Sequence, residues 1–289
     1  MSTDGRYYIP HKAHWPILGV IGLGTLLAGF ANLINGSSMG STMMIIGLLT
    51  FIVMLVGWFW LQASESESGM YNADVGVSYR WGMMWFIFSE VMFFAAFFGT
   101  LFYCRVYAIP WLAGEGGGPG PVTGEFLWKG FEAVWPTNGP GDVGGEFEPM
   151  GAWGLPALNT LILLSSGVTL TWAHWGLLAD NRDQMIKGLA ATVFLGFLFV
   201  YLQATEYQEA YHEMGLTLGS GIYGSTFFMM TGFHGLHVTI GAIILSVVLY
   251  RSIRGHFSKE NHFAFEAAAW YWHFVDVVWL ILFIFVYWM

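Results

Sequence analysis

Several ionisable side chains lie inside long apolar stretches, where they are costly unless they have a partner or a purpose. Glu90 is the clearest case: Phe86, Phe93, Phe94 and Phe97 flank it at helical spacings. Because an apolar surround disfavours a charged carboxyl group, we expect Glu90 to be largely neutral. Two roles stay open for it: hydrogen bonding to a neighbouring helix, or a part in proton handling or lipid packing.

His234 and His237 are three positions apart, on one face of a helix, which is an allowed spacing for two metal ligands. Two histidines do not complete a site, and neither a His-Glu-x-x-His motif nor a cysteine pair accompanies them, since Cys104 is the single cysteine. Hydrogen bonding between helices is therefore favoured, and no metal site is predicted.

His273 and Asp276 also share a helix face, so this carboxylate could orient an imidazole of its own helix or of a neighbour. Glu206 and Glu266 stand nearer the ends of apolar stretches, and we expect both to reach water more easily than Glu90 does. Neither a glycine-rich nucleotide loop nor a nucleophile, base and acid order is present. The sequence predicts a polar network within the membrane and no catalytic residues.

The elements that must position these residues are set by composition. The 289 residues are 56% hydrophobic, 10% charged and 18% aromatic, which is typical of a membrane protein. The net charge of -9 comes mostly from acids in loops or isolated in apolar stretches, so a nucleic-acid partner is not indicated.

Seven apolar runs reach the roughly 20 residues that a helix needs to cross a bilayer. They lack the alternation of barrel strands, so we predict an all-α, polytopic protein with seven transmembrane helices. The expected spans are 16–35, 41–62, 79–109, 154–178, 187–208, 221–250 and 263–289. The connection 110–153 is rich in Gly and Pro and should form an irregular outer loop, whereas the acidic stretch 64–69 is interpreted as a hinge.

Orientation follows from the Lys and Arg residues near the span ends, which are enriched on the cytoplasmic side. With the N-terminus inside, eight basic residues fall on the inner side and two on the outer side, so the C-terminus is predicted outside. The inner set is Arg6, Lys12, Arg80, Arg182, Lys187, Arg251, Arg254 and Lys259, and the outer set is Arg105 and Lys129.

Long ordered strings of Trp, His and Gly carry a more specific signal. They are Tyr79-Arg80-Trp81-Gly82-Met83, Phe88-Ser89-Glu90-Val91-Met92-Phe93-Phe94, Thr171-Trp172-Ala173-His174, Leu202-Gln203-Ala204-Thr205-Glu206-Tyr207, Tyr223-Gly224-Ser225-Thr226-Phe227-Phe228, Gly232-Phe233-His234-Gly235-Leu236-His237 and Trp270-Tyr271-Trp272-His273-Phe274-Val275-Asp276-Val277-Val278-Trp279. With these strings the chain resembles the subunit III family of cytochrome c oxidases. The match is weaker near the N-terminus, where Leu61-Gln62 replaces a charged pair found in many relatives.

The resemblance implies a subunit without haem or copper. Haem a and copper belong to partner subunits I and II, which reduce oxygen with electrons from cytochrome c and pump protons. It also implies a two-helix pair within 1–66 and a five-helix bundle within 67–289, separated by a cleft that holds phospholipid. The implied tasks are to stabilise subunit I, to sustain proton uptake and to ease oxygen access. Arg80 and Trp58 are the implied lipid-binding residues, and Glu90 is the implied buried acid of the bundle.

Two alternatives remain at this stage. Subunit III of a ubiquinol oxidase is disfavoured because such subunits usually lack the first two spans. An independent proton or ion carrier is disfavoured by the absence of paired broken helices. The expected location is the inner membrane of a bacterium, because the expanded loop at 110–153 resembles bacterial members; the mitochondrial inner membrane is the less favoured option.

Overall fold

The computed structural model describes residues 7–9, 14–115 and 122–289, so Arg6 and Lys12 lie outside the described residues. Within these described residues, the prediction of an all-α protein with seven long apolar helices is confirmed. These helices are α1 Trp15–Ile34, α2 Gly40–Glu67, α3 Ala73–Tyr103, α6 Leu155–Leu178, α7 Arg182–His212, α8 Gly221–Arg254 and α9 Phe263–Leu282. A π-helical segment, Cys104–Ala108, and α4 Ile109–Leu112 extend α3, and a second, Phe283–Trp288, extends α9.

The chain divides into two compact units, residues 1–81 and 82–289. In the first unit α1 and α2 form a closely packed pair, because glycines let their backbones approach. A Cβ added at Gly47 would collide with the backbone of Leu26, and one added at Gly29 would lie 2.9 Å from the Met43 carbonyl carbon. Small residues at helix contacts are the usual means of close packing in lipid.

The predicted hinge at 64–69 is wrong for most of its length, because α2 continues through Glu67. The buried carboxylate of Glu65 accepts hydrogen bonds from the hydroxyls of Tyr8 at 2.9 Å and Tyr71 at 2.7 Å. The bond to Glu65 raises the pKa of the Tyr8 hydroxyl above its ordinary value. The acidic residues of this stretch suggested a solvated turn, but the carboxylate of Glu65 is hydrogen-bonded by tyrosine hydroxyls within the fold.

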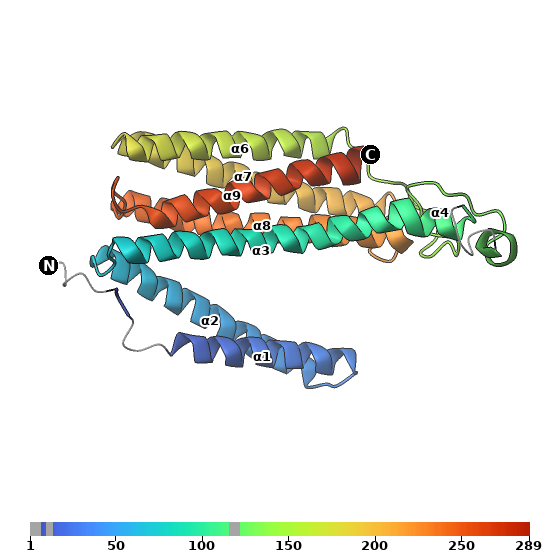
Figure 1. Cartoon of the computed structure of the whole chain (residues 1–289), viewed down its shortest axis with the longest axis horizontal. Coiled ribbons are helices and arrows are strands. Elements are labelled where there is room, and N and C mark those ends of the chain that lie inside the picture. Colours follow the sequence, from blue (N-terminus) through green and yellow to red (C-terminus); the bar gives the residue numbers. More distant parts are fainter. Residues whose placement is uncertain (1–6, 10–13, 116–121) are drawn as a thin grey trace. The chain divides into compact units, whose positions relative to one another are not determined.

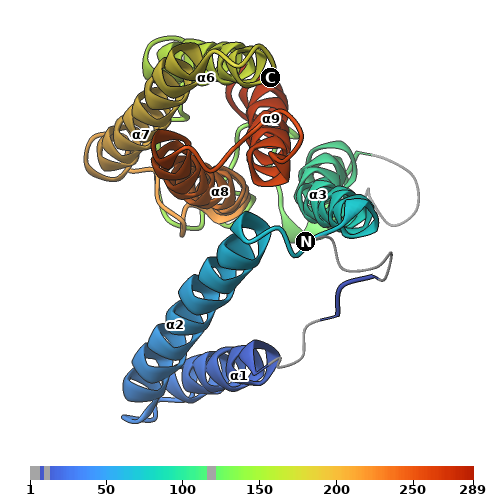
Figure 2. The same cartoon turned by 90° about the vertical axis from the view of Figure 1, so that its left-hand side faces the viewer.

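In the second unit α6, α7, α8, α9 and the later part of α3 run side by side (Figure 1). Seen end-on, α6 to α9 surround a shared core and α3 lies beside α9 (Figure 2). An ion pair links two connections between these helices. Lys259 Nζ, in the α8–α9 connection, lies 2.6 Å from Asp180 Oδ2 in the α6–α7 turn. This contact raises the pKa of Lys259.

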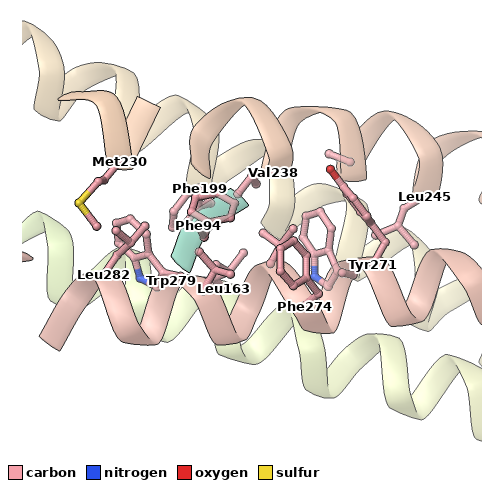
Figure 3. Packing of buried hydrophobic residues seen from close by; sticks show 14 of the residues in the cluster. Phe94, Leu163, Phe199, Met230, Val238, Leu245, Tyr271, Phe274, Trp279 and Leu282 are labelled. Atoms are coloured by element: carbon pink, nitrogen blue, oxygen red, sulfur yellow. The ribbon is translucent and has the colours of Figure 1, made fainter. Parts of the chain in front are cut away.

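The core of this unit centres on α9, whose Trp272 and Trp279 are fully buried. Figure 3 shows Trp279 among Phe199, Leu163 and Leu282, which come from three helices. Both indoles also use their N–H groups: Trp272 donates to Ser166 at 2.8 Å and Trp279 to Thr160 at 2.9 Å. Helix α9 is therefore fixed to α6 by packing and by hydrogen bonds.

Candidate functional site: two carboxyl–imidazole pairs in the bundle

The structure brings Glu90 of α3 to His237 of α8, two residues far apart in the sequence. Glu90 Oε2 lies 2.9 Å from His237 Nε2, and the side chains are 21% and 12% exposed. The other ring nitrogen, Nδ1, lies 2.6 Å from the carbonyl oxygen of Phe233. Glu90 therefore ties α3 to α8.

Hydrogen-bond valence fixes the protons of this pair. A carbonyl oxygen only accepts, so Nδ1 of His237 must carry a proton. Nε2 then either donates to a Glu90 carboxylate or accepts from a protonated Glu90. In both forms one proton lies between the two groups and their net charge is zero. This neutrality lowers the cost of placing two ionisable groups within a membrane span.

The phenylalanines predicted around Glu90 pack around its partner as well. The rings of Phe94 and Phe93 lie 5.1 and 6.0 Å from the imidazole of His237. Phe86 stacks on Tyr271, which in turn stacks on His237 at 6.4 Å. Aromatic rings therefore line the imidazole that contacts Glu90.

A second pair is formed by His273 and Asp276 of α9, whose Nδ1 and Oδ2 atoms lie 3.4 Å apart. Nε2 of His273 lies 3.4 Å from the hydroxyl oxygen of Thr171 on α6. Because that hydroxyl donates to the carbonyl of Gly167 at 3.0 Å, it accepts from His273. The same valence argument leaves one proton between His273 and Asp276. Gly167 makes the room, since a Cβ there would collide with the Asp276 carboxylate.

The two histidines predicted on one face of α8 do not converge on a common group. His234 is fully buried, and its Nε2 lies 3.2 Å from the carbonyl oxygen of Val275 on α9, whereas His237 turns to α3. Across residues 7–9, 14–115 and 122–289, no group of three or more His, Cys, Asp or Glu side chains is arranged to hold a metal ion.

The expectation that Glu206 reaches water easily is wrong, because its side chain is fully buried. Tyr287, in the π-helical extension of α9, donates a hydrogen bond to Glu206 Oε1 at 2.6 Å. The adjacent Tyr207 shares a 2.6 Å hydrogen bond with Thr231, and Gln203, three residues before Glu206, donates to the Thr231 carbonyl at 3.1 Å. Glu206 thus belongs to an interior polar layer, while Glu266 is half-buried.

Comparison with known proteins decides the family. The family model described as cytochrome c oxidase subunit III matches residues 5–115 and 128–289. The chain belongs to the cytochrome c oxidase subunit III family. Cytochrome c oxidase subunit 3 of Homo sapiens is 40% identical over 283 residues, covering 98% of this chain and 96% of that protein. The proteins of the same name from Aedes aegypti and Drosophila melanogaster are each 40% identical over 100% of this chain and 99% of their own length.

Membership of the subunit III family establishes the general function of the chain as a subunit of cytochrome c oxidase. The chain is a multi-pass membrane protein and a non-catalytic subunit of the terminal respiratory oxidase, in a family that carries no redox centre. Both carboxyl–imidazole pairs therefore belong to a subunit whose contribution to the oxidase is not electron transfer.

The two residues that the resemblance assigned to lipid lie in the first unit. Trp58 is exposed on α2. Arg80 is half-buried on α3, and a Cβ added at Gly76, one turn earlier, would lie 3.6 Å from its guanidinium group.

Some residues of the polar contacts were not predicted from the sequence. They are the two tyrosines that donate to Glu65, Thr171, which contacts His273, and Tyr287, which donates to Glu206. The sequence could have indicated Thr171, because its hydroxyl lies within Thr171-Trp172-Ala173-His174, one of the strings that resemble the subunit III family.

Proposed function

We propose that this chain is the scaffold of the oxidase for subunit I, its main contact, in a complex that also contains subunit II. In this role it stabilises subunit I, sustains proton uptake and eases oxygen access. Haem a and copper reside in subunits I and II, which receive electrons from cytochrome c. The observation that carries the proposal is the Glu90–His237 contact, which makes the intramembrane acid a neutral link between α3 and α8.

Assembly of the oxidase without this chain tests the scaffold role. Because the redox centres lie elsewhere, we expect their optical spectra to be unchanged while thermal stability and the rate of proton uptake fall. Difference spectroscopy, thermal inactivation and proton uptake by reconstituted vesicles measure the three effects. An oxidase that keeps its stability and its proton uptake without the chain would contradict the proposal.

The lipid-binding role belongs to the same proposal: Arg80 contacts the phosphate of a bound phospholipid, and Trp58 is a second lipid-binding residue. A basic residue near the inner end of a span suits a phosphate group. We expect Arg80→Gln to lower the phospholipid phosphorus that co-purifies with the oxidase, measured after extraction. Lys187→Gln is the matched control, because Lys187 pairs with Asp183 on α7. Equal phosphorus in both variants would exclude a role of Arg80.

We place the chain in a bacterial inner membrane with its N-terminus in the cytoplasm and its C-terminus in the periplasm. The excess of basic residues on one side supports the orientation. Residues 116–127, which the family model leaves unmatched, support an expanded outer loop. We expect an impermeant amine reagent to label Lys129 from outside and Lys259 only after permeabilisation. Labelling of both from the same side would overturn this topology.

A further inference from the structure

The second carboxyl–imidazole pair differs from the first in where it lies. His273 is the eleventh residue of the span Phe263–Trp288, so it lies about 15 Å along the helix, near the middle of a bilayer about 30 Å thick. Its side chain is nevertheless 44% exposed on the surface of the second unit. Exposed apolar residues continue this face on both helices: Val168 and Trp175 on α6, Val277 and Ile281 on α9. We call this face the α6–α9 seam.

The contacts of His273 within the chain leave hydrogen-bonding capacity unused. Both ring nitrogens make contacts of 3.4 Å, at the long end for a hydrogen bond, whereas His237 makes contacts of 2.6 and 2.9 Å. The buried Oδ1 atom of Asp276 has no partner within the described part of the chain. The Glu90–His237 pair makes short contacts, whereas both contacts of the half-exposed His273 ring are long.

Lipid tails cannot satisfy an exposed imidazole, because they offer neither donors nor acceptors. Ionisable groups within membrane spans therefore face a bundle interior or a water-filled cavity, and rarely lipid. The apolar neighbours Val168, Val277 and Ile281 do not fit a water-filled surface. What fits is a second protein helix that is apolar along most of its length and polar at one depth.

We infer that the α6–α9 seam docks against a transmembrane helix of subunit I, which presents a hydroxyl, amide or imidazole side chain to His273 at mid-membrane depth. The inference rests on the proposed function, in which subunit I is the main contact. It adds the face that makes the contact and the chemistry of the group received. Helices α6 and α9 lie side by side along this face (Figure 2), so one approaching helix can touch both.

Site-directed photocrosslinking in the intact oxidase tests the seam. A photoreactive amino acid is placed at Val168 or Val277, with Phe194 as the matched control. Phe194 is equally exposed but lies on α7, near the depth of Val168, because Thr169 and Thr192 of the two helices share a 2.8 Å hydrogen bond. We expect adducts with subunit I from Val168 and Val277, and lipid adducts or none from Phe194.

Adducts with subunit I from Phe194 alone, or only lipid adducts from Val168 and Val277, overturn the seam while leaving the scaffold role intact. Failure of the wild-type chain to co-purify with subunit I overturns the proposed function itself.

The polar contact is tested by detergent titration of the assembled oxidase. We expect His273→Leu to release the chain from subunit I at a lower detergent concentration than wild type, and His273→Gln to restore retention because it keeps donors and an acceptor. Retention of His273→Leu at the wild-type level overturns the role of His273. Equal release of His273→Leu and His273→Gln also overturns it, because loss of packing alone would explain that result.

Discussion

Trp272→Ala is expected to lower the free energy of unfolding of the second unit by about 3–5 kcal/mol, the usual range for truncating a large buried aromatic residue. The indole lies between α7 and α8: a Cβ added at Gly196 would be 2.6 Å from its Cη2 atom, and one added at Gly241 would be 2.9 Å from its Cε3 atom. Its N–H also donates to Ser166 on α6. Alanine would therefore open a void where three helices meet α9.

Unfolding of the purified oxidase in increasing denaturing detergent, followed by loss of the chain's helical signal, measures this effect. Phe194→Ala is the matched control, because Phe194 is exposed on α7, outside the α6–α9 seam, and its removal leaves no void. Trp272→Phe should fall between the two, since it keeps a ring but loses the hydrogen bond to Ser166. Equal effects at Trp272 and Phe194 would show that the interior of this unit is not the main source of its stability.

The sequence predicts the spans well because length and apolar composition alone decide whether a helix can cross a bilayer. The ends are less well predicted, because a charged residue does not end a helix that extends beyond the hydrocarbon. The fifth span was expected from residue 187, yet α7 begins at Arg182, where the Asn181 side chain accepts a hydrogen bond from the backbone N–H of Gln184. Such a cap depends on local geometry that hydropathy does not contain.

The polar pairs were predictable only where one helix holds both members. His273 and Asp276 are three residues apart, so helical spacing was enough to suggest their contact. Glu90 and His237 are 147 residues apart, and their meeting depends on how α3 and α8 are rotated about their axes. Helical spacing gives the face of each helix, but van der Waals packing and hydrogen bonds between helices select the partner.

Depth along a helix was a poor guide to burial for Glu206. The position near the end of α7 suggested access to water, but the extension of α9 brings Tyr287 over it. A residue's exposure in a bundle depends on the lengths of its neighbours, and the length of α9 could not be related to α7 from one sequence.

Glu90→Ala is expected to weaken the bundle, whereas Glu90→Gln is expected to preserve assembly and change turnover little. Alanine leaves Nε2 of His237 without its partner, a cost of about 1–3 kcal/mol for the unsatisfied group, to which the void adds. Glutamine keeps the shape, and its amide can donate to Nε2 of a neutral His237. It thus reproduces the form of the pair in which Glu90 holds the proton, while removing the proton that could leave.

The comparison of these two variants separates a structural acid from one that carries protons. Oxygen consumption and proton release are measured for both in reconstituted vesicles, and detergent unfolding reports the stability of each. Because the pair is neutral in either of its proton arrangements, and the redox chemistry lies in other subunits, a structural acid predicts normal pumping with glutamine and impaired assembly with alanine. A double-mutant cycle with His237→Ala should show that the effects of the two alanine variants are not additive, since each removes the same contact. If Glu90→Gln assembled normally and yet abolished pumping, the neutral link between α3 and α8 would be insufficient, and the proton shared by Glu90 and His237 would have to exchange during turnover.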